Sequence, residues 1–292
     1  MLRGTLILLL ALALPAASDA EPAQVVAKPE LSWHLDGSLV GSGLAAIGFS
    51  FALATDDRPV PVDGFPSSDV RLDLDRDAIG KNDANAWTAS HVMAGLSLAY
   101  PLLLRAAFSE DNERLSSSMN IAVMTLESVV IAQGVGGIVK PLVSRPRPFT
   151  YLAESDRPSG AEYDVQRERA FQSFPSDHSS TAWAAVSTGI CDHLLSHPTA
   201  SWSEHAAVGL IGGVLATATA GLRVEAGQHF PTDVAAGSML GIACGTTVPL
   251  LHRYTSGSVK APLPPRKSML GALAGTAVGI GLGVLTVEAV GD

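Results

Sequence analysis

Three short stretches of the chain carry residue types that could bind and transfer a phosphoryl group. The first covers residues 140–148, KPLVSRPRP, in which Arg145 and Arg147 each precede a proline. Proline favours an extended geometry in the preceding residue, which stiffens the strip and directs the two guanidinium groups. A guanidinium group grips phosphate oxygens in pairs. Taken alone, the strip fits a basic segment beside a membrane helix equally well.

The second stretch, residues 173–180 with the sequence SFPSDHSS, opens an apolar run. Ser176 or Asp177 would cap the helix that starts here, and a helix N-terminus binds anions through its free N–H groups and its dipole. His178 would lie in the first turn, beside a bound anion. An imidazole there could act as a general acid, because its ordinary pKa is near neutrality. A plain capping sequence is the alternative.

The third stretch covers residues 223–233, RVEAGQHFPTD. His229 and Asp233 are four positions apart, so one helical face would carry both. Pro231 suits the first turn of a helix. A carboxylate beside an imidazole fixes its tautomer and leaves the other ring nitrogen free as a nucleophile. An incidental pair at a polar helix start is the alternative.

The composition predicts that long apolar helices position these stretches. Hydrophobic residues make up 47% of the chain and charged residues 16%, whereas soluble domains carry roughly 25% charged residues. We see no strand alternation and therefore predict an all-α, multi-helix transmembrane bundle, with a tightly packed soluble helical protein as the alternative. The predicted helices cover Gly37–Ala54, Ala86–Phe108, Met119–Val139, Ser179–Leu195, His205–Leu222, Pro231–Leu251 and Met269–Val290.

The three stretches all lie at ends of predicted helices. If the helices cross alternately, these ends lie on one side, where three cations and two imidazoles surround a helix N-terminus. No carboxylate cluster suited to Mg²⁺ accompanies them, so we predict metal-free phosphoryl transfer without a cofactor. The net charge of -9 disfavours a nucleic-acid partner. The side chains on the common face are Lys140, Arg147, His178, Arg223, His229 and Asp233.

The order and spacing of these residues resemble the phosphatidic acid phosphatase type 2 superfamily, which also contains bacterial acid phosphatases and vanadium haloperoxidases. The family pattern is K-x6-RP, then PSGH, then SR-x5-H-x3-D, and it aligns here with residues 140–148, 175–178 and 222–233. The resemblance covers roughly residues 119–251. It implies a six-helix phosphatase core whose active site faces away from the cytoplasm, with the C-terminal helix as an addition to that core.

The resemblance also implies a role for each residue. His229 would attack phosphorus and form a phosphohistidine, Asp233 would hold His229, and His178 would protonate the leaving oxygen, after which water cleaves the intermediate. Arg145 receives no role. The phosphate-binding residues that the resemblance implies are Lys140, Arg147, Ser176, Asp177 and Arg223.

Two residues depart from the family pattern. Asp177 replaces a glycine and Leu222 replaces a serine. Aspartate tolerates unusual backbone angles, so the N–H of Asp177 could still face the phosphate while its side chain points away. The PSDH form, together with RPRPF, is similar to undecaprenyl-diphosphate phosphatases of the bacitracin-resistance type.

We therefore expect a phosphatase that acts on a lipid phosphate or diphosphate whose tail stays in the bilayer. The partners that we expect are this substrate and the membrane, and the sequence makes no prediction of oligomeric state. Three alternatives stay open: a soluble secreted acid phosphatase, a vanadate-dependent haloperoxidase, and a membrane binding protein without turnover. The polar residues 150–171 would cover the site, or form a solvated loop.

The sequence divides into four parts. Residues 1–20 resemble a signal peptide with cleavage after Ala20. Residues 21–85 hold one apolar helix and an acidic loop, which we expect to be solvated. Residues 86–251 form the core, and residues 252–292 form a basic, proline-rich linker and the C-terminal helix. In the core, Glu127 lies at membrane depth and is expected to face the bundle interior.

Two orientation signals disagree. A cleaved leader followed by three crossings would place the site in the cytoplasm, whereas the basic linker 253–267 favours a site on the outer side. We reconcile them by expecting that the helix at 37–54 does not fully cross the membrane or lies along its surface. The predicted location is the bacterial inner membrane with a periplasm-facing site, with a soluble periplasmic protein as second choice.

Overall fold

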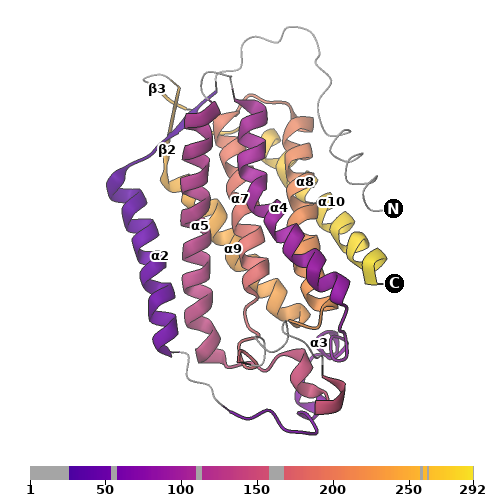
Figure 1. Ribbon diagram of the computed structural model, residues 1–292. Coiled ribbons are helices and arrows are strands. Elements are labelled where there is room, and N and C mark those ends of the chain that lie inside the picture. The colour runs from indigo at the N-terminus through magenta and orange to yellow at the C-terminus, as the bar shows by residue number, and fades with distance from the viewer. Residues whose placement is uncertain are drawn as a thin grey trace.

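Seven long helices stand side by side in the part of the chain that the computed structural model describes (Figure 1). The described residues are 26–53, 58–109, 114–157, 168–256, 259–261 and 263–291, so the predicted leader lies outside them. The all-α prediction is confirmed. The helices are α2 (Trp33–Leu53), α4 (Ala84–Phe108), α5 (Arg114–Val143), α7 (Asp177–Ser196), α8 (Trp202–Glu225), α9 (Pro231–Leu251) and α10 (Arg266–Gly291).

Helices α4 and α8 begin earlier than the apolar runs predicted, and each begins after a polar capping residue. Asp83 caps α4 by accepting a hydrogen bond from the backbone N–H of Asn85 at 2.7 Å. Ser201 caps α8 by accepting one from the N–H of Glu204 at 3.1 Å. Such caps satisfy the free N–H groups of the first turn. Because the first turn itself is polar, a search for apolar runs starts these helices too late.

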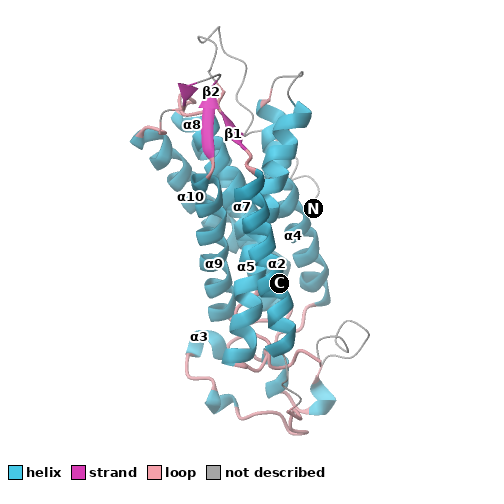
Figure 2. Ribbon diagram, turned by 90° about the vertical axis from the view of Figure 1, so that its left-hand side faces the viewer, coloured by secondary structure: helices cyan, strands magenta, loops and turns pink. Residues whose placement is uncertain are grey.

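A small antiparallel sheet corrects the expectation of no strands. It consists of β1 (Lys28–Glu30), β2 (Arg253–Ser256) and β3 (Val259–Lys260) in the order β1-β2-β3, with Pro29 opposite Tyr254. Strands of two to four residues are too short to show alternation. The sheet joins the chain before α2 to the chain after α9, at the end of the bundle opposite α3 (Asp73–Arg76) (Figure 2).

Glycines bring three pairs of parallel helices into close contact. A Cβ atom at Gly241 of α9 would lie 2.8 Å from the Cβ of Trp183 in α7, and one at Gly283 of α10 would lie 2.8 Å from the Cβ of Thr217 in α8. A Cβ atom at Gly134 of α5 would lie 2.7 Å from that of Ala46 in α2. Larger residues would force these helices apart, which is the packing expected of small residues in membrane bundles.

The first apolar helix, α2, packs along α5. Both helices run in the same direction, away from the sheet, over most of their length (Figures 1 and 2). Residue 28 and the basic linker therefore lie at one end of the bundle. The candidate site residues lie at the other end.

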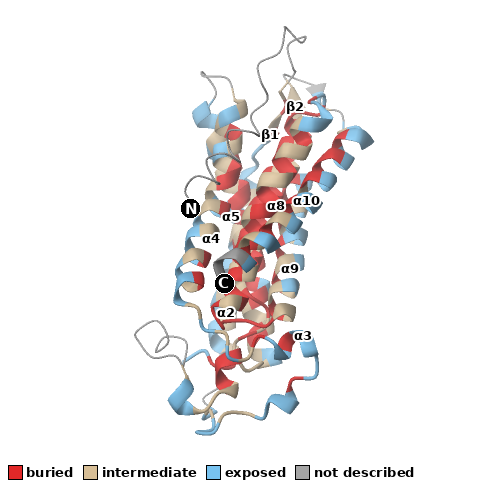
Figure 3. Ribbon diagram, turned by 90° about the vertical axis from the view of Figure 1, so that its right-hand side faces the viewer, coloured by how far each residue is buried: buried red, intermediate tan, exposed pale blue. Residues whose placement is uncertain are grey.

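The outer surface of the bundle is apolar. Six of the described helices are long and apolar enough to cross a membrane, namely all of the long ones except α7. Large side chains such as Phe51, Leu103 and Met239 are 71%, 63% and 72% exposed. In contrast, α7 packs against α4, α5, α8 and α9 and buries serine, threonine and aspartate side chains. Figure 3 shows buried residues gathered in the interior of the bundle. Apolar residues outside and polar residues inside suggest a membrane protein.

Candidate active site

The three sequence stretches meet at the end of the bundle that lacks the sheet. Lys140 is in the last turn of α5, Asp177 and His178 begin α7, and His229 lies between α8 and α9 (Figure 1). The short segments α3 and η2 (Pro148–Tyr151) lie at the same end. Ser144 ends α5 in a left-handed conformation, with φ of 46° and its N–H 2.8 Å from the carbonyl of Lys140. This helix end starts the extended, proline-rich strip.

The tautomer of His229 follows from a backbone contact. Its Nδ1 lies 2.7 Å from the carbonyl oxygen of Ser173. Since a carbonyl oxygen can only accept, Nδ1 carries the proton and Nε2 carries the lone pair of the neutral ring. Nε2 lies 3.5 Å from Nη1 of Arg147. The free nitrogen of His229 is therefore directed at the cation that would hold a phosphoryl oxygen.

The surroundings of His229 keep its ring neutral. The residue is only 2% exposed. Burial lowers its pKa well below the ordinary value, and the positive charges of Arg147, Lys140 and Arg223 lower that pKa further. The hydrogen bond to Ser173 acts in the opposite direction but is outweighed. A neutral imidazole beside three cations is suited to nucleophilic attack on an anion.

Asp233 differs from the expected triad geometry. Its Oδ2 lies 3.8 Å from Nδ1 of His229, close enough to attract a charged ring but too far for a hydrogen bond. The same oxygen accepts hydrogen bonds from Ser173 Oγ at 2.5 Å and from the N–H of Phe230 at 2.9 Å. Asp233 thus caps α9 and holds Ser173, whose carbonyl in turn orients His229.

Arg145, which the sequence analysis left without a role, binds the other oxygen of Asp233. Its Nη1 lies 2.5 Å from Asp233 Oδ1 and 2.7 Å from Thr232 Oγ1, and its Nη2 lies 2.7 Å from Asp75 Oδ2. Asp75 also accepts from the N–H of Thr232 at 3.0 Å and is 1% exposed. The expectation of a solvated acidic loop is therefore wrong at Asp75. Only its neighbours in the DLDRD run, such as Asp73, face solvent.

Backbone carbonyls hold the two cations of the first stretch. Lys140 Nζ lies 2.7 Å from the carbonyl of Pro175 and 3.1 Å from that of Gln172. Arg147 Nη1 donates to the carbonyl of Gln228 at 2.9 Å, and its Nε donates to that of Arg169 at 3.1 Å. Both side chains are almost completely buried. Their charges are thus positioned in advance, as a phosphate site requires.

Arg223 and His178 approach from the α4 side. Arg223 is 2% exposed and its Nη1 donates to Ser90 Oγ of α4 at 3.1 Å. The His178 ring lies edge-on to His91, with centroids 4.8 Å apart, and interacts electrostatically with Arg223 and His229. The sequence analysis missed His91, because a lone histidine within an apolar helix gives no signal of its position.

The Asp177 side chain was expected to point away from the phosphate, but it lies beside one of the cations of the site. Its Oδ1 lies 3.4 Å from Lys140 Nζ, because Lys140 is the cation nearest to the start of α7. Ser176 caps α7, because its Oγ accepts a hydrogen bond from the N–H of Ser179 at 3.5 Å, and its own N–H donates to the carbonyl of Asp233 at 3.1 Å. A phosphate at Lys140 would therefore compete with the Asp177 carboxylate.

The predicted cover, residues 150–171, is described only at its two ends. Residues 158–167 lie outside the described part. Phe171 is buried and packs against Phe65, with ring centroids 6.0 Å apart, and the N–H of Glu154 donates to the carbonyl of Val62 at 2.8 Å. Both ends are therefore attached to the loop that leads to Asp75.

The chain was compared with models of protein families. Residues 121–256 match the model of the PAP2 superfamily, which supports a phosphatase-type function. No curated protein and no solved structure matches the chain. The matched region contains all eight predicted site residues. Asp75 and His91 lie before it.

Proposed function

We propose that the protein is a membrane phosphatase that hydrolyses a lipid phosphate or diphosphate through a phosphohistidine intermediate. The observation that carries the mechanism is the orientation of His229, whose Nδ1–H is bound to the Ser173 carbonyl while Nε2 faces Arg147. The apolar outer surface supports a lipid substrate. A tail in the bilayer would bring its phosphate to the end of the bundle.

In the first step, Nε2 of His229 attacks phosphorus, an N–P bond forms and the bond to the leaving oxygen breaks. His178 donates a proton to that oxygen. The imidazole gains positive charge, which the Ser173 carbonyl and the nearby Asp233 carboxylate stabilise. Lys140, Arg147, Arg223, the Ser176 hydroxyl and the N–H of Asp177 bind the phosphoryl oxygens. In the second step, water gives a proton to His178 and its oxygen attacks phosphorus, the N–P bond breaks to return the lone pair to Nε2 of His229, and inorganic phosphate leaves.

We also propose that the site faces the periplasm in the bacterial inner membrane. The linker 253–267 carries four basic residues and no acidic residue, as expected of a cytoplasmic segment. Because β1 pairs with β2, residue 28 lies at the same end as this linker.

The test of the phosphatase proposal is phosphate release from a panel of lipid phosphates in detergent with a metal chelator. The native chain should release phosphate, vanadate should block release, and His229→Ala should abolish it. His34→Ala is the matched control, because His34 is exposed on α2, outside the site. Acid quenching should trap a phosphoenzyme from the native chain and none from His229→Ala. Equal release by His229→Ala and the native chain would disprove the mechanism, and a preference for small soluble phosphomonoesters would disprove the lipid substrate.

A further inference from the structure

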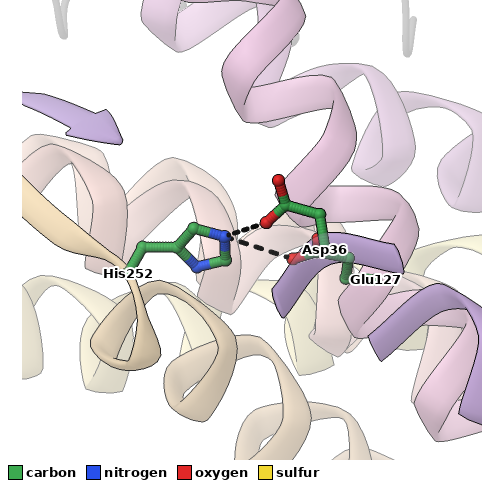
Figure 4. A group of neighbouring side chains, drawn as sticks. All are labelled: Asp36, Glu127 and His252. Atoms are coloured by element: carbon green, nitrogen blue, oxygen red, sulfur yellow. Dashed lines mark hydrogen bonds and ion pairs between the residues drawn. The ribbon is translucent and has the colours of Figure 1, made fainter. Parts of the chain in front are cut away.

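A second cluster of polar groups lies at the end of the bundle opposite His229. It consists of Asp36 in α2, Glu127 in α5 and His252 directly after α9 (Figure 4). His252 Nε2 lies 3.0 Å from Asp36 Oδ1 and 3.6 Å from Glu127 Oε2. One ligand atom from each residue lies within 4.8 Å of the other two. Since the residues come from α2, α5 and the end of α9, only the folded bundle forms this cluster.

The buried carboxylate of Glu127 requires a hydrogen-bond donor or a positive charge beside it. Its side chain is completely buried, and neither of its carboxylate oxygens has a hydrogen-bond partner among the residues that the structure describes. Such a carboxylate carries a desolvation cost of several kcal/mol. Figure 4 shows it directed at the His252 ring, next to Asp36. The cluster therefore lacks a group that would satisfy the Glu127 oxygens.

The orientation of His252 indicates what that group is. Its Nδ1 lies 2.9 Å from the carbonyl of Val248, so Nδ1 donates and the lone pair of the neutral ring is on Nε2. That lone pair faces two carboxylates. A backbone carbonyl that orients the second nitrogen is the usual arrangement of a metal-binding histidine.

We propose that Asp36, Glu127 and His252 bind a divalent transition metal ion, with Zn²⁺ as the first candidate. The two carboxylates and the neutral imidazole together carry two negative charges. A divalent cation cancels both charges, whereas a single bound proton cancels only one. Zinc ligands at about 2.1 Å in a tetrahedron lie about 3.4 Å apart, and the observed spacings of 3.0 and 3.6 Å fall on either side of that value. A mixed nitrogen and oxygen site favours Zn²⁺ over Mg²⁺ or Ca²⁺.

The ion would have a structural role. α9 has 21 residues, so its two ends are about 30 Å apart, and Asp233 and His252 lie at opposite ends. The cluster is thus separate from the phosphate site. An ion here would connect α2 to α5 and α9, next to the sheet that joins the same parts of the chain.

The test is zinc binding by the tag-free, full-length protein in detergent at neutral pH, measured by equilibrium dialysis and metal analysis. The native chain should hold one Zn²⁺ and show a higher Tm with it. Glu127→Gln and His252→Gln should each weaken binding at least tenfold. Asp36→Asn should weaken zinc binding as well. Because the Asp36 side chain is partly exposed, this substitution disturbs the core least. Co²⁺ in the native site should give the visible absorption of a tetrahedral complex.

A matched control comes from another buried histidine at the same end. His205 in α8 lies near His193 and Glu204, and His205→Gln should leave zinc binding unchanged. The proposal is overturned if the folded native chain binds no zinc, which would mean that a proton shared among the three residues neutralises them. It is also overturned if His205→Gln abolishes binding, or if the three cluster variants fold and bind zinc as the native chain does.

Discussion

The guanidinium group of Arg145 is bonded to the carboxylate of Asp233, with Nη1 only 2.5 Å from Oδ1. The other terminal nitrogen of Arg145 is bonded to Asp75, which lies in the short helix α3 before α4. Asp233 in turn binds Ser173, whose carbonyl orients His229. A carboxylate outside the matched family region is therefore connected, through three residues, to the proposed nucleophile.

This connection predicts that Asp75→Asn lowers catalysis without removing any group that touches the substrate. We expect kcat/KM to fall about tenfold, or ~1.4 kcal/mol, because Arg145 and Thr232 lose their charged partner and Asp233 is held less firmly. Steady-state phosphate release measures the effect. Asp75→Glu should recover part of the activity.

Asp73→Asn is the matched control for Asp75, because Asp73 lies in the same short helix with a side chain that is 90% exposed. Its kcat/KM should equal that of the native chain. Equal activity of Asp75→Asn and Asp73→Asn in folded protein would contradict a positioning role for Asp75.

The electrostatics of His229 predict a shift of the pH profile. Because burial and nearby cations lower the pKa of His229, the reactive neutral ring persists below the pH at which an ordinary histidine is protonated. Removing the charge in Arg147→Gln raises that pKa. The acidic limb of kcat/KM should therefore move to higher pH in the variant, besides the loss of rate.

The substrate's own ionisation contributes to both profiles, so the difference between the native chain and Arg147→Gln reports His229. The ionic strength is held constant across the pH series. Acidic limbs that coincide in the two proteins would show that Arg147 does not act on the proton affinity of His229.

The ion pair between Lys140 and Asp177 predicts tighter anion binding when the carboxylate is removed. Asp177→Gly should lower the inhibition constant of vanadate roughly two- to fivefold, since a half-exposed pair of this kind is worth about 0.2–1 kcal/mol. Asp177→Asn removes the charge while keeping the side-chain size, and should show a similar effect. If only the glycine variant binds more tightly, the cause is backbone geometry and not charge.

The proposed orientation predicts which end of the bundle a membrane-impermeant maleimide reaches from outside. Leu263 in the basic linker and Val62 at the site end are 79% and 67% exposed. In a background with Cys191→Ala and Cys244→Ala, Val62→Cys should react in cells with a permeable outer membrane, whereas Leu263→Cys should react only after lysis. The reverse pattern would place the site in the cytoplasm and agree with a cleaved leader.

Apolar runs and three local motifs were enough to predict the helices and to group the candidate site residues. Long apolar runs report helices directly, so the predicted helix centres agree with the structure, whereas the polar first turns and the last turn of α5, residues 140–143, were missed. The motifs at 140–148, 173–180 and 223–233 are local, because the chemistry of each depends on residues a few positions apart. Because successive helices of the core run in alternating directions, these three motifs lie at one end of the bundle.

The way in which these residues are held depends on long-range contacts. Asp75 meets Thr232 across 157 positions and Arg145 across 70, and nothing in the DLDRD run distinguishes Asp75 from its neighbours. The group that orients His229 is a backbone carbonyl, which every residue carries and no sequence pattern marks. The cluster of Asp36, Glu127 and His252 likewise exists because α2 packs along α5. Long-range packing decides such contacts, and the sequence alone does not reveal them.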